Sequence, residues 1–240
     1  MSAWLLDFII FLILATGFAF VMSLITNYSH YDEELHNYYS QYEEEYNAKV
    51  DIKSEEYEAL SEEDQARYKA MFEALNSDQE VLYVYNMTIN LMIVIASVGC
   101  LMAVLISEFV IPLFFKNGQT IGKKVFSLGV VKTNSVRITH LQLFVRTLLG
   151  KFAIEIMIPV IMCILLIAGQ ANVFHVILLV GIVIFQAMVT MMTKYHQAIH
   201  DILSYTVVVD LQTQMIFDNE DELLEYKKQN HLIEIKSTKD

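Results

Sequence analysis

The chain has 240 residues, of which 55% are hydrophobic, and a formal net charge of −12. Its apolar residues gather in runs of about 20, the length a helix needs to cross a bilayer core, which excludes an ordinary soluble globular protein. Glycine and proline are scarce, at 8 and 2 residues, so long helices are favoured over a loop-rich β fold. Cys100 and Cys163 both lie inside apolar runs and do not form a disulfide or zinc pattern.

The apolar runs predict four transmembrane helices. The expected parts of the chain are a first helix (1–26), an acidic helical hairpin (27–80), a second helix (81–115), a basic loop (116–151), the third and fourth helices (152–192) and a strand with a tail (193–240). The first run lacks a basic start and a small-residue cleavage site, so it is expected to be a retained helix rather than a signal peptide. The second run exceeds the bilayer length, so its helix is expected to begin outside the lipid at a cap on Ser77, and Pro112 is expected to bend or end it.

Residues 27–80 carry sixteen acids and four bases, which accounts for the whole net charge. Two stripes at spacings near three and four residues, one from Tyr28 to Val50 and one from Tyr57 to Leu75, predict helices with tyrosine-rich faces. We expect a helical hairpin outside the membrane, packed through those faces. A solvated cap is the plain interpretation, and a docking surface for a partner or a funnel for cations is the alternative.

Residues 116–151 carry seven basic side chains and no acid. Short cytoplasmic loops collect lysine and arginine, and this bias sets the orientation of membrane proteins. With four spans, a cytoplasmic basic loop places both termini in the cytoplasm and the acidic hairpin on the opposite side.

Short strand-like patterns occur on the cytoplasmic side. Val125–Lys132 and Arg137–His140 predict a β-hairpin, and Tyr205–Leu211 is expected to pair with it. A short helix is expected over Glu220–Lys228. The predicted fold class is therefore an all-α membrane protein, a four-transmembrane-helix bundle with an extracytoplasmic helical hairpin and a small cytoplasmic β-sheet.

Ionisable residues within membrane helices are costly and mark candidate sites. Four acids are expected to converge near the cytoplasmic ends of the helices, with Arg146 and Lys123 as counter-charges; the acids are Asp7, Glu108, Glu155 and Asp201. One interpretation is a site for a proton or monovalent cation. The structural alternative has Asp7 and Glu155 pair with Arg146 and Lys151 to fix helix packing.

Two motifs that would indicate an enzyme are incomplete. The segment 118–124, GQTIGKK, has three residues between its glycines and a lysine after Lys123, whereas a phosphate loop needs four residues and a serine or threonine. His196 and His200 have the spacing of a zinc helix, but Gln197 stands where a general base would be. We therefore expect no enzyme, no catalytic residue, no metal, no cofactor and no nucleic-acid partner.

The stretches GQTIGKKVFSLGVV (118–131) and HQAIHDILSYTVVV (196–209), together with Arg146, resemble the RDD family of bacterial membrane proteins. The matching signature residues are Gly118, Thr120, Gly122, Lys123, His200 and Asp201, and Asp7 corresponds to the family's first aspartate. The resemblance covers about 3–25 and 87–210, and the acidic hairpin looks like an insertion.

The resemblance implies a multi-pass protein of the bacterial cytoplasmic (inner) membrane, and a transport role, including cation/proton antiport, has been attached to some members. The family's arginine usually precedes the first aspartate by two turns, whereas no arginine precedes Asp7 here. Arg146 is expected to take its place as the partner of Asp7.

Two functions remain open. The first is cation/proton transport or ion handling through the inner carboxylates, with protons or monovalent cations as ligands and a homo-oligomer as the expected assembly. The alternative is a non-transporting adaptor or regulatory subunit that binds a membrane protein partner through the acidic hairpin or the cytoplasmic sheet. The lipid bilayer is the expected surrounding in both cases.

Overall fold

The computed structural model describes residues 2–237. Among these residues, four helices are long and apolar enough to cross a membrane. They are α1 (Ser2–Ile25), the continuous segment Gln79–Phe114, the continuous segment His140–Ile167 and α10 (Val173–Met192). The four predicted spans are thus confirmed as helices, and the third begins earlier than its apolar run because a polar, well-capped turn precedes it.

The chain forms two compact units. Unit 1 contains residues 1–18 and 97–240, and unit 2 contains residues 19–96. Helices α1 and α5 (Gln79–Val104) each contribute residues to both units.

Unit 2 consists largely of the acidic segment. Helices α2 (Tyr28–Tyr46), α3 (Ser54–Glu58) and α4 (Glu62–Ser77) follow the two predicted stripes. Their core is made of buried Met71, Leu75 and Val81, against which tyrosines of α2 and α4 pack. The apolar stripe of a polar helix is buried in this way because each ring removes apolar surface from water.

The start of α5 corrects one prediction. Ser77 does not cap the helix, because its hydroxyl donates back to the carbonyl of Glu73 at 2.7 Å. The cap is Asp78, whose carboxylate accepts from the backbone N–H groups of Glu80 at 2.9 Å and Val81 at 3.3 Å. An aspartate satisfies two of the free N–H groups of a first helical turn, which a serine turned back into α4 cannot do.

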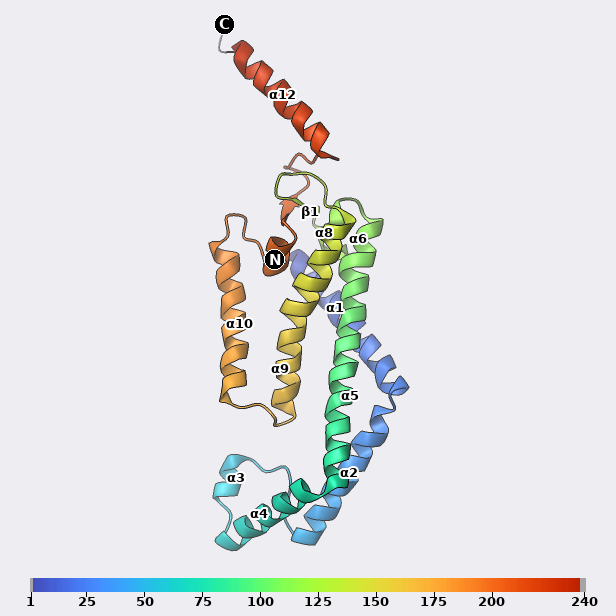
Figure 1. Ribbon diagram of the computed structural model, residues 1–240, viewed down its shortest axis with the longest axis vertical. Coiled ribbons are helices and arrows are strands. Elements are labelled where there is room, and N and C mark those ends of the chain that lie inside the picture. The colour runs from blue at the N-terminus through green and yellow to red at the C-terminus, as the bar shows by residue number, and fades with distance from the viewer. Residues whose placement is uncertain (1, 238–240) are drawn as a thin grey trace. The chain divides into compact units, whose positions relative to one another are not determined.

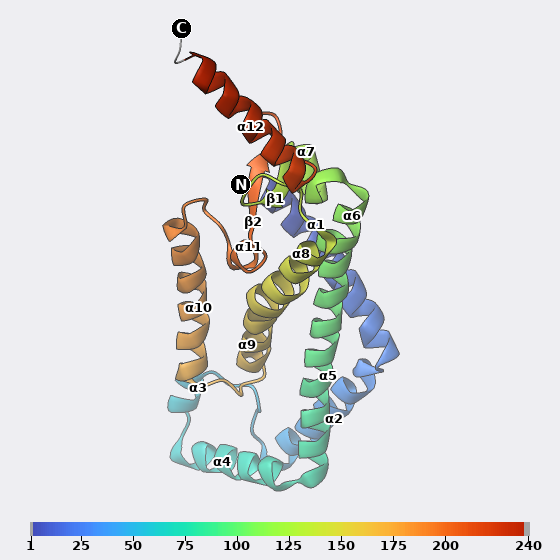
Figure 2. The same ribbon diagram turned by 45° about the horizontal axis from the view of Figure 1, so that its top comes forward.

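Unit 1 contains the proline-interrupted parts of two helical segments. The first passes from α5 through a π-helix, η1 (Leu105–Val110), into α6 (Ile111–Phe114). The second passes from α8 (His140–Val145) through a longer π-helix, η3 (Arg146–Met157), into α9 (Ile158–Ile167). Within unit 1, η1 and η3 are in contact, and there the two segments run in opposite directions (Figures 1 and 2).

The two interruptions repeat one sequence pattern. The chain has two prolines, and each stands four residues after a glutamate and directly after an isoleucine, in Glu108–Pro112 (EFVIP) and Glu155–Pro159 (EIMIP). Proline has no N–H to donate to the carbonyl four residues earlier, so an α-helical bond is lost at the glutamate. In both segments the π-helix contains the glutamate, and the α-helix resumes at the isoleucine before proline. The wide turn therefore has a local cause in each case.

The sheet of the described residues has two strands. β1 (Leu128–Lys132) pairs antiparallel with β2 (Thr206–Asp210), so the predicted pairing with the 205–211 segment is confirmed. The predicted hairpin is confirmed at its turn, where the N–H of Lys132 donates to the carbonyl of Val136 at 2.8 Å and Arg137 forms an antiparallel bridge with Val131. The expected strand over Arg137–His140 does not form beyond this bridge, because His140 begins α8 with a capping box on Thr139. The capping box of Thr139 and Gln142 engages the backbone at the point where the strand would have continued, and it begins the long third helix instead.

Unit 1 also contains three short helices and one longer helix near the C-terminal end of the described residues. They are η2 (Lys116–Gly118), α7 (Ile121–Val125), α11 (Ile199–Leu203) and α12 (Glu220–Ser237). Helix α12 is longer than the expected Glu220–Lys228, and its first turns pack Leu223 against Val136 and Phe217 in a small buried cluster. The elements that position the site are α1, η1, α7, η3 and α11.

Candidate functional site

Eight ionisable side chains in unit 1 form a connected set, which we name the charge cluster. Its members are Asp7, Glu108, Lys123, Arg146, Lys151, Glu155, His200 and Asp201, linked by contacts of 4.0 Å or less. They come from α1, η1, α7, η3 and α11. The structure therefore brings the four predicted acids together, although a basic or imidazole group stands between them.

Asp7 is held by α7. Its carboxylate accepts from the hydroxyl of Thr120 at 2.5 Å and from the backbone N–H of Gly122 at 2.7 Å. The Nζ of Lys123 lies 3.6 Å from the same carboxylate, and burial lowers the pKa of this lysine. A Cβ on Gly122 would lie 2.8 Å from the Cγ of Asp7, so only glycine lets α7 approach α1 this closely.

Arg146 connects the third helix to α11. Its Nε donates to the Oδ1 of Asp201 at 3.0 Å, and the same oxygen accepts from the hydroxyl of Thr206 at 3.1 Å. Burial alone would raise the pKa of Asp201, but the guanidinium of Arg146 outweighs it and holds this pKa below its ordinary value. A buried, charge-assisted pair of this kind fixes the position of α11 on η3.

His200 lies between Arg146 and Glu155. The Nη2 of Arg146 is 2.9 Å from His200 Nε2, and His200 Nδ1 is 2.7 Å from an oxygen of Glu155. Because arginine can only donate, Nε2 must accept and Nδ1 must carry the proton that binds Glu155. Burial first, and then Arg146, lower the pKa of His200 more than the nearby carboxylates raise it. The imidazole is therefore neutral at neutral pH, and its tautomer is defined by its neighbours.

Gly150 makes the approach of α11 to η3 possible. A Cβ at this position would lie 2.5 Å from the Cα and Cβ of His200. Any larger residue would push α11 away and break the contacts of His200 with Arg146 and Glu155.

Glu108 is the most contacted acid of the cluster and is 3% exposed. Lys151 donates to its Oε1. Its Oε2 lies 3.7 Å from Arg146 Nη1 and 4.0 Å from Lys123 Nζ, and it accepts no hydrogen bond from any described residue. Pro112 has no N–H to donate to the backbone carbonyl of Glu108. This carbonyl instead accepts a hydrogen bond from the hydroxyl of Thr147 at 3.0 Å.

A pocket of about 240 Å³ adjoins the charge cluster. Three acids (Asp7, Glu108 and Glu155) and Lys151 contribute its charged lining. Its remaining lining includes aromatic residues of α1 and the side chain of Gln186 from α10; the aromatic residues are Trp4, Phe8 and Phe11. The side-chain Nε2 of Gln186 is buried and has no hydrogen-bond partner among residues 2–237. The pocket therefore joins an apolar wall to a polar one.

The pairings differ from those expected. Arg146 does not bind Asp7, because Lys123 and the start of α7 occupy that position, and Arg146 binds Asp201 instead. The structural alternative also named the wrong partners, since Glu155 binds His200 and Lys151 binds Glu108. These contacts depend on the direction in which each side chain leaves its helix. The π-helices change that direction relative to a regular α-helix, so the sequence pattern did not predict the partners.

The sequence interpretation missed four residues of the site: Gly150, Thr147, Thr206 and Gln186. A sequence signal was available for the wider site, because the repeated glutamate–proline spacing marks two interrupted helices. Paired interruptions of hydrophobic segments indicate a binding site in many transporters. Gln186 carries a weaker signal, as an uncharged polar residue inside an apolar run.

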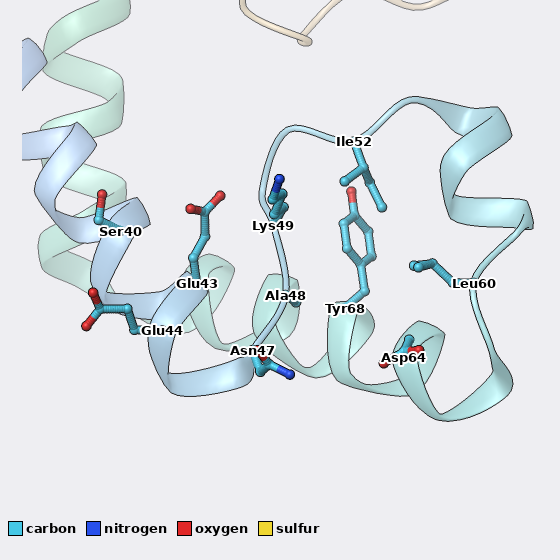
Figure 3. Close-up of a pocket in the computed structure, with 10 residues that line it drawn as sticks. All are labelled: Ser40, Glu43, Glu44, Asn47, Ala48, Lys49, Ile52, Leu60, Asp64 and Tyr68. Atoms are coloured by element: carbon cyan, nitrogen blue, oxygen red, sulfur yellow. The ribbon is translucent and has the colours of Figure 1, made fainter.

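Unit 2 contains a second pocket, of about 620 Å³. Figure 3 shows Tyr68 rising from α4 toward Ile52, with Leu60 pointing into the same space from the opposite side. Its charged lining consists of Glu43, Glu44 and Asp64 against Lys49. This pocket is acidic, but the carboxylate of Glu43 is engaged by the backbone N–H of Val50 at 2.7 Å.

Comparison with known proteins gives one positive result. The sequence model of the RDD family matches residues 1–205, most of the chain. No curated protein and no solved structure matches it. The match includes every member of the charge cluster and extends across the acidic segment.

Proposed function

Since this chain belongs to the RDD family, we propose that it is a multi-pass protein of a bacterial cytoplasmic membrane that binds a proton or a monovalent cation in its charge cluster and exchanges it across the membrane. The four apolar helices and the family membership support a membrane protein. The charge cluster and its pocket support the ion-handling role.

The proposed orientation follows the charge distribution. Five of the seven bases of residues 116–151 lie between the second and third apolar helices, and the other two, Arg146 and Lys151, lie in the first half of the third helix. Fifteen of the sixteen acids of residues 27–80 lie between the first and second helices, and Glu80 lies in the first turn of the second. The positive-inside rule then places the basic segment, the two-stranded sheet and both termini in the cytoplasm. Helices α2, α3 and α4 lie on the outer side.

The observation that carries the proposal is the unbalanced charge of the cluster. Four carboxylates face three basic side chains, Lys123, Arg146 and Lys151, so the cluster has a net charge of −1 when all seven are ionised and His200 is neutral. An unbalanced buried charge costs several kcal/mol in a medium of low dielectric. One proton or one monovalent cation balances it.

The acids divide into two roles. Asp7 and Asp201 each accept hydrogen bonds from α7 or from neighbouring side chains and fix the packing of elements. Glu108 and Glu155 stand at the two proline-interrupted turns and line the same pocket. We assign the exchangeable ion to Glu108 and Glu155, and a positioning role to Asp7 and Asp201.

The test is transport in proteoliposomes that contain a pH-sensitive dye. An imposed Na⁺ or K⁺ gradient is expected to move protons with the parent protein, and Glu155→Gln is expected to reduce the rate at least tenfold. Glu220→Gln, which changes a surface partner of Lys132, is the matched control and should keep the parent rate. If neither gradient moves protons with folded parent protein, the ion-exchange proposal is wrong.

A second candidate function rests on unit 2. This unit has its own core and an acidic pocket, neither of which an ion carrier of this size requires. An adaptor would hold a membrane protein partner through this surface. Deletion of residues 31–76 is the test. Loss of a co-purifying partner, with the fold of the rest of the chain intact, favours the adaptor, whereas retention of every partner argues against it.

A further inference from the structure

From the pocket beside the charge cluster, we infer that the chain binds a molecule with a primary ammonium group and a nearby hydrogen-bond acceptor, as in an amino alcohol or the ethanolamine head group of a lipid. This inference deepens the proposed function by naming the class of cation, and it rests on that function for the sign of the ligand's charge.

The size of the pocket is the first argument. A volume of about 240 Å³ corresponds to roughly eight water molecules at about 30 Å³ each. A proton or a bare alkali ion would leave most of this space unfilled. A small organic cation of several heavy atoms fills it.

The charge of the lining selects a cation. Asp7, Glu108 and Glu155 line the pocket together with a single base, Lys151, which Glu108 already binds. An anionic group would face three carboxylates and no free cation among the described lining residues. A positively charged group is attracted, and burial strengthens that attraction.

Two polar atoms define the hydrogen bonds that the ligand must make. The Oε2 of Glu108 accepts no hydrogen bond from a described residue, although Arg146 Nη1 and Lys123 Nζ lie 3.7 and 4.0 Å from it. The Nε2 of Gln186 has no acceptor among the described residues, and both atoms are buried. A buried polar atom without a hydrogen bond lowers the stability of the protein. A primary ammonium supplies the donor, and a hydroxyl, ester or phosphate oxygen a few atoms away supplies the acceptor.

The aromatic wall suits the same molecule. Trp4 and Phe8 stack with their ring centroids 5.3 Å apart, and Phe8 and Phe11 are 6.4 Å apart. Aromatic faces attract cations and also pack against short carbon chains. Because Trp4 and Phe8 are 65% and 41% exposed, the wall borders the surface of α1, where a ligand from the lipid as well as one from water can reach it.

The single tryptophan of the chain provides the readout, since Trp4 lies on the pocket wall. The full chain is placed in nanodiscs of phosphatidylglycerol, and its tryptophan emission is followed during titration with ethanolamine, choline or NaCl. Ethanolamine is expected to change the emission and to saturate. Choline has no N–H to donate to Glu108 and is expected to bind at least tenfold more weakly.

The variants that locate the site leave Glu108 unchanged, because its removal would leave Lys123, Arg146 and Lys151 without this carboxylate partner. Gln186→Leu removes a side-chain amide that lacks a partner and is expected to weaken ethanolamine binding about fivefold or more. Gln229→Leu, an exposed position in α12, is the control and should bind as the parent does. Equal binding of choline and ethanolamine, or no effect of Gln186→Leu, overturns the inference.

A second set of nanodiscs separates the two sources of the ligand. In phosphatidylethanolamine discs, a lipid ligand gives the emission of the bound state before any addition, and added ethanolamine changes nothing further. A soluble ligand gives the same titration in both lipids. If ethanolamine changes the emission in neither lipid and the two lipids give the same emission, the inference is wrong, whether or not the protein exchanges protons. If ethanolamine binds but the protein does not exchange protons, only the transport proposal is wrong.

Discussion

The Nη2 of Arg146 lies 2.9 Å from the Nε2 of His200, and this contact places the imidazole proton on Nδ1, where it binds Glu155. His200 is the base of the cluster whose ordinary pKa, 6.5, lies nearest to neutral pH, so its protonation changes the net charge of the cluster there. Protonation of His200 breaks its contact with Arg146 and removes the excess negative charge.

The first prediction concerns pH. The pKa of His200 is below its ordinary value of 6.5 in the folded protein, so the unfolded chain binds the proton more readily. Stability should therefore fall as pH decreases through about 6.5. The measurement is the thermal unfolding midpoint in detergent at pH 7.5, 6.5 and 5.5. His200→Gln, whose amide can donate to Glu155 and accept from Arg146, should reduce this dependence, and His140→Gln, an exposed site in α8, should retain it.

The second prediction concerns the close approach of α7 to α1. Gly122→Ala places a methyl group 2.8 Å from the Asp7 Cγ, and such overpacking costs about 1 to 3 kcal/mol. Gly181→Ala, where no described atom lies within 4 Å of the added Cβ, is the matched control. Reversible unfolding in SDS, followed by circular dichroism, measures both. A Gly122→Ala protein as stable as Gly181→Ala would mean that Asp7 is not held by α7.

The third prediction concerns the π-helices. Pro159→Ala restores the N–H that can donate to the carbonyl of Glu155, which favours a regular α-helix and turns Glu155 away from His200. We expect a stability equal to or above that of the parent and a loss of proton movement of at least tenfold. Leu166→Ala, on the same helix, serves as the control. Unchanged proton movement in a stable Pro159→Ala protein would show that the wide turn is not needed.

The fourth prediction concerns unit 2. The hydroxyl of Tyr42 donates to Asp78 at 2.8 Å, and this bond, with burial and the negative charge of Asp78, raises the pKa of Tyr42 to about 12. Tyr42→Phe should remove one late-titrating group from the ultraviolet titration of the thirteen tyrosines. Tyr83→Phe, at a ring that is 60% exposed, is the control, and a late phase that survives Tyr42→Phe would contradict the assignment.

Much of the fold was predictable from apolar run length and local capping. The spans of α1 and α10 follow directly from their apolar runs, and the stripes of the acidic segment predicted helices α2 and α4. The errors arose where two local hydrogen-bonding arrangements were possible. Asp78 rather than Ser77 caps α5, and the Thr139 cap takes the place of a longer second hairpin strand. Such competitions depend on a few hydrogen bonds of similar energy, which a pattern does not rank.

The amino-acid sequence alone was sufficient to identify the charged residues that matter, because an ionisable side chain in an apolar run has a high cost and is rarely accidental. It was also sufficient to identify the family resemblance that the match over residues 1–205 confirms. Only the tertiary structure decided the partners. Lys123 rather than Arg146 binds Asp7, and His200 rather than Lys151 binds Glu155. The physical reason is that an ion pair needs two side chains within about 4 Å, and the proline-induced π-turns and the contacts at Gly122 and Gly150 set those distances between residues far apart in the chain.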